Sequence, residues 1–120
     1  MNRMLGRVLL VVALLFGTPH LLLSQDNVMF AHFINVGQAN STLLEFSCGA
    51  ILINAGASDD DHIANLTDYL HTFFQDRTDL NNTLESIIIT HNHIDHTRAL
   101  VWILSDLTKS WRLKDTFRPG

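Results

Sequence analysis

The chain has 120 residues, which leaves room for one small domain and excludes two. It carries 8 Lys and Arg against 12 Asp and Glu, and charged residues make up 17% of it, below the roughly 25% usual for soluble domains. The single cysteine, Cys48, excludes an internal disulfide, and we expect it to be a small buried apolar side chain.

The first 25 residues have the layout of a secretory signal. Arg3 and Arg7 precede a run of nine apolar residues, Val8 to Phe16, and Pro19 follows shortly after it. A bilayer takes about 20 apolar residues to span, so no stable membrane span is expected. We therefore predict a signal peptide over residues 1–25 and an exported protein, periplasmic or extracellular. The alternative is a membrane anchor formed by an uncleaved N-terminal segment.

Residues 26–120 are acidic, because they hold all 12 Asp and Glu but only six of the 8 basic residues. Binding to nucleic acid depends on clustered Lys and Arg. The basic cluster near the C-terminus comprises Lys109, Arg112, Lys114 and Arg118. Nucleic acid is therefore a weakly supported partner.

Three consecutive strands are predicted next. Residues 28–36 (VMFAHFINV) are apolar at nearly every position, which indicates a strand covered on both faces, with His32 as a satisfied core or edge polar group. Residues 41–47 (STLLEFS) and 50–54 (AILIN) predict two further strands. The two residues between them suit a hairpin turn.

Beyond Gly56, apolar residues recur at helical spacing as far as Arg77, which predicts an amphipathic helix. Its apolar stripe comprises Ile63, Leu66, Leu70 and Phe73, with Tyr69 and Phe74 alongside. Ser58 or Asp59 can cap this helix. We interpret the three carboxylates from Asp59 to Asp61 as a solvated first turn rather than a metal site, because consecutive residues point apart on a helix.

The last predicted elements are a strand and a helix. Residues 78–83 form a polar linker, and residues 86–90 (SIIIT) predict a short, fully buried strand of the parallel type. Residues 97–107 (TRALVWILSDL) predict a largely buried helix. Its apolar positions are Leu100, Val101, Leu104 and Leu107, widened by Trp102 and Ile103. The order β-β-β-α-β-α predicts an α/β fold with a mixed sheet.

Three of the 7 histidines fall within six residues directly after the last strand. In an extended segment, residues two apart face the same way, so His91 and His93 can bind one metal ion while Asp95 and His96 face a second position. Such ligands suit zinc or manganese, as one ion or as a pair about 3.5–4 Å apart that activates a bridging water. The alternative is a polar loop with solvent-facing histidines, in which Asp95 or Thr97 caps the following helix.

The text of residues 91–96 (HNHIDH) resembles the H-x-H-x-D-H signature of the metallo-β-lactamase fold superfamily. Residues 33–44 (FINVGQANSTLL) resemble F-x-D-V-G-Q-G-D-(S/A)-x-L-I, the opening of its ComEC-like competence-protein branch, and residues 51–56 (ILINAG) resemble that branch's I-L-I-D-(A/T)-G. The resemblance covers roughly residues 28–104. It implies the N-terminal half of an αβ/βα sandwich, usually with two zinc or manganese ions, in a family of hydrolases of phosphoesters, thioesters, lactones or β-lactams. The branch is associated with extracytoplasmic nuclease-like activity on DNA.

The resemblance also implies roles for individual residues. His91 and His93 would bind the first metal, and Asp95 and His96 the second. Asp95 would in addition orient the attacking water or take its proton, which makes it the candidate catalytic residue.

Three positions depart from the family pattern. Asn35 and Asn54 each stand where the branch has Asp, and Ala39-Asn40 replaces Gly-Asp. At Asn54 the family uses a carboxylate to support the metal ligands. An Asn cannot ionise, and losses of such support typically cost about 10–100-fold in metal affinity or activity.

A full domain of this family is longer, and its second half supplies a further His, a bridging Asp and a last His. None of these has a candidate after His96. We therefore expect residues 26–120 to be a partial hydrolase domain whose open sheet face promotes self-association or is covered by a partner chain.

The expected function is an exported metal-dependent hydrolase in which metal-bound hydroxide attacks a phosphoester or acyl-type bond of a small-molecule or phosphoester substrate. The alternative is a non-catalytic metal-binding or interaction fragment that lacks the second-half ligands.

Overall fold

The computed structural model describes residues 28–106 and 112–113, so the predicted signal peptide and most of the basic C-terminal cluster lie outside it. The elements follow in the order β1 (Phe30–Phe33), β2 (Thr42–Phe46), β3 (Gly49–Ile53), α2 (Asp60–Asp76), a 3₁₀ turn (Thr78–Leu80), β4 (Thr83–Leu84), β5 (Ser86–Ile88), α3 (Ile94–Thr97), α4 (Leu100–Asp106) and β6 (Arg112–Leu113). The predicted α/β order is confirmed, and β4, α3 and β6 are additions to it. None of the described helices is long and apolar enough to cross a membrane.

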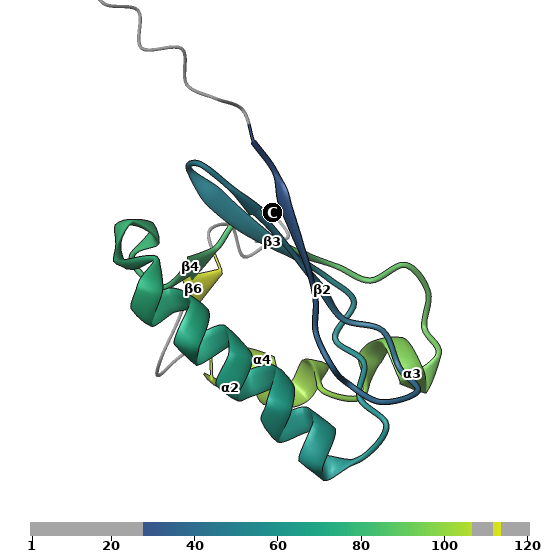
Figure 1. The fold of residues 1–120 in the computed structure, drawn as a ribbon. Helices are drawn as coiled ribbons and strands as arrows, with labels where there is room; N and C mark the ends of the chain where they lie inside the picture. Colours follow the sequence, from purple (N-terminus) through teal and green to yellow (C-terminus); the bar gives the residue numbers. More distant parts are fainter. Residues whose placement is uncertain (1–27, 107–111, 114–120) are drawn as a thin grey trace, which may run out of the picture.

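The main sheet is mixed and has the strand order β1-β2-β3-β5. β1, β2 and β3 form an antiparallel meander, and β5 returns parallel to β3 after the crossover through α2. Figure 1 shows α2 lying along one side of this sheet. β4 and β6 pair as a small second sheet, which is parallel.

The core lies between the main sheet and the helices. The predicted apolar stripe of α2 is buried as expected. The buried residues of the helix are Ile63, Leu66, Leu70, Phe73 and Phe74. Asp59 caps the helix by accepting a hydrogen bond from the His62 backbone N–H at 3.0 Å. Hydrogen bonds from His62 also hold the pKa of the Asp59 carboxyl below its usual value. The capping prediction is therefore confirmed at Asp59.

A polar cluster joins the C-terminal half of α2 to the meander. Nε2 of His32 lies 2.8 Å from Oε2 of Glu45, and its Nδ1 lies 2.6 Å from the Tyr69 hydroxyl. Arg77 donates to the same carboxylate and, at 2.8 and 2.9 Å, to Asp79, whose hydrogen bonds raise the pKa of the guanidinium. Burial, with a contribution from Glu45, raises the pKa of Tyr69. His32 is thus the satisfied polar group that the sequence predicts.

The strand register aligns two rows of side chains across the four strands. The first row consists of His32, Leu43, Leu52 and Ile87. It faces α2, since the leucines are fully buried in the core and His32 contacts Tyr69 and Phe73. The second row therefore faces the opposite side of the sheet.

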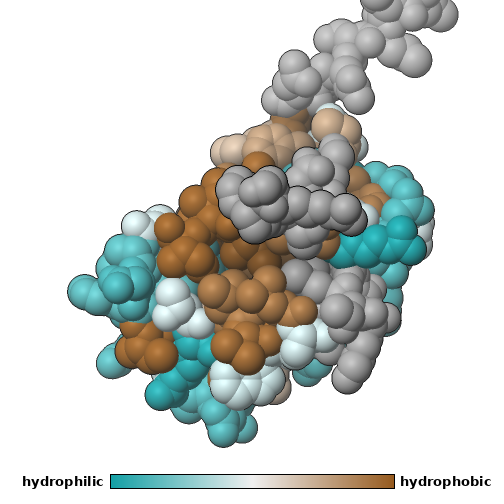
Figure 2. Space-filling view, turned by 180° about the vertical axis from the view of Figure 1, so that it is seen from behind, coloured by the Kyte–Doolittle hydropathy of each residue, from teal (hydrophilic) through white to brown (hydrophobic). Residues whose placement is uncertain are grey.

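This second row consists of Phe33, Thr42, Ile53 and Ile88. Its ends are open, with Phe33 85% and Ile88 46% exposed. The predictions of a first strand covered on both faces and of a fully buried strand at residues 86–90 are therefore wrong. Among the described residues, helices cover this sheet on one face, so the row towards α2 is sealed and the ends of the second row are not. A broad apolar area is visible when the molecule is seen from behind (Figure 2).

Two further burial predictions are wrong. Cys48 is exposed and not buried, because it lies in the tight turn between β2 and β3, where its side chain has no core to pack against. The helix predicted over residues 97–107 begins later, because α3 ends at Thr97 and α4 begins at Leu100, and α4 packs on the core through Ile103. Leu107, the last predicted position of its apolar stripe, lies outside the described residues. Val101, Trp102 and Leu104 are exposed, because a short helix with one contact face leaves its other faces open.

We predict that residues 26–120 self-associate through the open row of the sheet, since burying exposed apolar side chains is favourable. The double variant Phe33→Ser with Ile88→Ser should shift the sedimentation profile towards the monomer. Val101→Ser, which removes a 69% exposed side chain from α4 instead, is the control and should leave the profile unchanged. A monomeric unaltered protein would contradict this prediction.

Candidate functional site

A sharp backbone corner follows β3 and fixes both ends of the histidine segment. Asn54 adopts a left-handed conformation with φ of 60°, which asparagine tolerates better than most residues. Its N–H donates to the carbonyl of Ile88 at 2.8 Å. The next residue, Ala55, donates to the His96 carbonyl and accepts from the Ala99 N–H, both at 2.8 Å. The end of β5 and the start of the helices are thus attached to one corner.

Gly56 lets a third segment join this corner. Its N–H donates to the Asn40 carbonyl at 3.0 Å, and the Asn40 N–H donates to the Asp95 carbonyl at 2.9 Å. A Cβ atom on Gly56 would lie 1.8 Å from the Asp95 carbonyl oxygen and 2.7 Å from that of Asn40. Only glycine allows the three backbones to approach this closely.

The histidines that the sequence predicts as metal ligands converge beside this corner. The ring centroids of His91 and His93 are 4.6 Å apart, and those of His91 and His96 are 3.9 Å apart. His93 is the N-cap of α3, so Asp95 and His96 lie in the first turn of that helix. The structure therefore places His91 next to both His93 and His96. The sequence predicts instead that His91 pairs with His93 and that His96 pairs with Asp95.

The donor types present suit zinc, and two of them have the matching separation. Nε2 of His96 and Oδ2 of Asp95 are 3.3 Å apart. Two ligands on a tetrahedral zinc with bonds of about 2.0–2.1 Å are separated by about the same distance. Within residues 28–106 and 112–113, however, no three His, Cys, Asp or Glu side chains are arranged to hold one ion. A third donor would have to rotate into place or come from outside the described part of the chain.

Asn54 supports the histidines through Thr90, a residue that none of the sequence motifs singles out. Asn54 is buried, and its Oδ1 accepts from the N–H and the hydroxyl of Thr90 at 2.9 and 3.0 Å. The Thr90 oxygen in turn lies 3.1 Å from Nδ1 of His91 and 3.3 Å from Nδ1 of His96. The only sequence signal for Thr90 is its place between the strand and the first histidine.

Asn40 and Asn54, two of the residues that depart from the family pattern, are hydrogen-bonded to each other. Nδ2 of Asn54 donates to Oδ1 of Asn40 at 3.1 Å. A carboxylate at position 54 could not donate this hydrogen bond. Asn35 has a separate, local role, since its side chain accepts from the Gly37 N–H at 3.4 Å.

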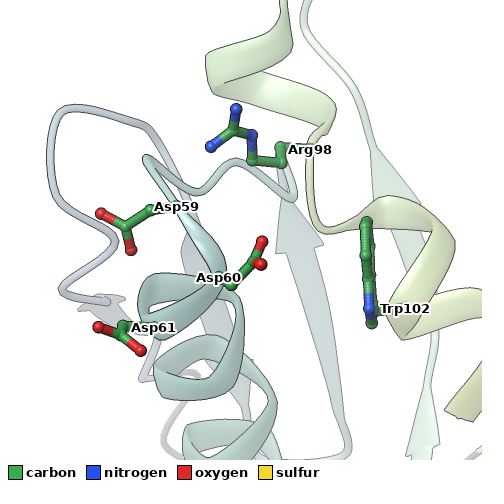
Figure 3. Close-up of a pocket in the computed structure, with 5 residues that line it drawn as sticks. All are labelled: Asp59, Asp60, Asp61, Arg98 and Trp102. Carbon is green, nitrogen blue, oxygen red and sulfur yellow. The ribbon is translucent and has the colours of Figure 1, made fainter.

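A second polar region lies at the start of α2. A shallow cavity of about 540 Å³ is lined by Asp59, Asp60, Asp61, Arg98 and Trp102. Figure 3 shows the three carboxylates at the helix start, with Arg98 from the segment between α3 and α4 and Trp102 from α4. Arg98 also donates to the Ser58 carbonyl, which links the helix start to the segment between α3 and α4.

No family model matches the chain, and comparisons with curated proteins and with solved structures find no significant match. The chain is a small mixed α/β domain.

We predict that Gly56→Ala destabilises the protein by roughly 3 kcal/mol or more, because the new methyl group would overlap two backbone carbonyls. Urea unfolding followed by circular dichroism measures the loss. Gly49→Ala is the control, since the added atom there meets the flexible side chain of Glu85 at 2.7 Å. Equal losses in the two variants would show that the corner at Gly56 has no special role.

Proposed function

We propose that this chain carries the metal-binding loop of a metallo-β-lactamase-type hydrolase, with residues 91–96 as that loop. One observation carries the proposal: the three segments that resemble family motifs meet at a single corner. Asn40 comes from the first segment, Gly56 from the second and Asp95 from the third, and backbone hydrogen bonds join them. These segments are distant in sequence, and the resemblance alone does not require their contact in this chain.

In this proposal zinc, as one or two ions, is the cofactor, with manganese as the alternative metal. His91, His93, Asp95 and His96 would hold it. When bound, it supplies a water of lowered pKa that can attack a phosphoester or acyl-type bond. Asp95, whose side chain is 47% exposed, would orient that water or accept its proton.

The sheet, with α2 and α4 on one side, would be the N-terminal half of an αβ/βα sandwich. Its open row, which ends at Phe33 and Ile88, would be the surface that a second half, a second copy or a partner chain covers. We propose an exported location from the layout of residues 1–25. The substrate would be a small molecule or phosphoester, and the acidic balance of residues 26–120 argues against non-specific binding of nucleic acid.

A second candidate function is that of a non-catalytic metal-binding or interaction fragment. The incomplete donor arrangement in the described residues favours it. Asn54 favours it too, because an amide supports metal-bound imidazoles less strongly than a carboxylate does.

We predict that His91→Ala combined with His93→Ala abolishes stoichiometric metal binding, because it removes two adjacent imidazoles of the loop. Elemental analysis after zinc loading and extensive dialysis measures the metal per chain. The control is His62→Ala with His71→Ala, which removes two imidazoles from α2 and should leave the zinc content unchanged. Unchanged zinc content in the His91→Ala and His93→Ala double variant would show that these two residues are not metal ligands.

The same preparations separate the two candidate functions. A hydrolase should turn over a phosphodiester or acyl ester when loaded with zinc, and Asp95→Asn should reduce this turnover more than it reduces the zinc content. Retained zinc with no turnover on either substrate class would favour the metal-binding fragment.

A further inference from the structure

The hydrogen bonds around Thr90 can be given a direction, starting from one backbone group whose role is fixed. The Thr90 N–H can only donate, and it lies 2.9 Å from the Asn54 side chain. The atom that faces it is therefore the amide oxygen. The Asn54 amide nitrogen then points at Oδ1 of Asn40, 3.1 Å away, as a donor. The orientation of this buried amide is thereby set.

The amide orientation decides the role of the Thr90 hydroxyl. Its oxygen lies 3.0 Å from Oδ1 of Asn54, which can only accept, so the single hydroxyl hydrogen is used there. Two lone pairs remain on the Thr90 oxygen. Nδ1 of His91 and Nδ1 of His96 lie 3.1 and 3.3 Å from it. An oxygen that has already donated its hydrogen can only accept from them, so both Nδ1 atoms must carry hydrogen.

We infer that Thr90 is a positioning residue that holds His91 and His96 as Nδ1-protonated tautomers, with the lone pair of each neutral ring on Nε2. The same shared oxygen accounts for the close approach of the two rings, whose centroids are 3.9 Å apart. The fixed point of the arrangement is the Asn54 amide, which is 2% exposed.

Under the proposed function, on which this step rests, the Nε2 lone pairs of His91 and His96 would bind the metal ion. Metal-bound histidines commonly donate one ring N–H to a neighbouring group and bind through the other nitrogen. With its lone pair on Nε2, neutral His96 presents that pair towards Oδ2 of Asp95 at 3.3 Å. Two electron-rich atoms that face each other at this distance favour a positive charge between them, either a second ring proton on Nε2 or a metal ion.

The test is the ring-nitrogen chemical shifts of the metal-free full chain, at alkaline pH where ordinary imidazoles are neutral. His91 and His96 should show a protonated Nδ1 and an unprotonated Nε2. His32 is an internal reference of the opposite tautomer, because its Nε2 faces the Glu45 carboxylate at 2.8 Å and its Nδ1 can accept from the Tyr69 hydroxyl at 2.6 Å. The Thr90 hydroxyl, by contrast, has used its hydrogen on Asn54. Finding Nε2–H in either loop histidine of the unaltered protein would overturn the inference, whatever the variants do.

Two substitutions at Thr90 distinguish an effect of its hydroxyl group from an effect of its side-chain shape. Thr90→Val keeps the shape, and both rings should lose the Nδ1–H tautomer. Thr90→Ser keeps the hydroxyl and should retain it. Unchanged tautomers in a folded Thr90→Val protein would overturn the inference.

Zinc alone, titrated against a competing chelator, tests the functional half of the inference. Thr90→Val should bind zinc about 10–100-fold more weakly than the unaltered chain, and Thr90→Ser should restore the affinity. Equal affinities despite altered tautomers would overturn the positioning role. Because the tautomers are read without metal, failure of the proposed metal function is distinguishable from failure of the tautomer assignment.

Discussion

The close approach of three backbones at Gly56 is the constraint on which the rest of the site depends. The Gly56 N–H bonds to Asn40, Asn40 bonds to Asp95, and the adjacent Ala55 bonds to His96, all at 2.8–3.0 Å. These bonds form between main-chain groups, so they hold the histidine segment in place whatever its side chains do. The main chain therefore sets the position of the site. We call these main-chain hydrogen bonds the frame of the site, and the side chains are attached to it. In the proposed function, such a frame reduces the conformational cost of assembling metal ligands.

The two faces of the main sheet have different roles. The face towards α2 carries the core and a hydrogen-bonded polar cluster, in which Arg77 and His32 both reach the carboxylate of Glu45. The opposite face is apolar and is left open at Phe33 and Ile88. A sheet sealed on one face only buries less apolar surface than a complete two-layer sandwich, so the domain gains stability from any partner that covers the open row. The exposed apolar side chains of the open row are therefore the physical reason for the self-association that we expect.

Local patterns in the sequence predicted what depends on local chemistry. The hairpin strands, the Asp59 cap and the buried stripe of α2 follow from alternation, capping preference and helical period, and all three are observed. Burial of α4 and of the strand at residues 86–90 was predicted wrongly, because an apolar run does not say which of its faces finds a partner. No local pattern points to Thr90, because its role depends on Asn54, which is 36 residues away in the chain. Asn54 itself was found through the family resemblance, but its pairing with Asn40 required the structure.

The backbone hydrogen bonds around the histidines should exist before any metal binds. Amide hydrogen exchange of the metal-free protein tests this directly at Asn40, Ala55 and Ala99, whose N–H groups bond to Asp95, His96 and Ala55. We expect these three amides to be protected as strongly as the amides that pair β2 with β3, and to gain little further protection when zinc is added. Exchange of all three at the rate of an unstructured peptide, with protection gained only on adding zinc, would contradict this expectation.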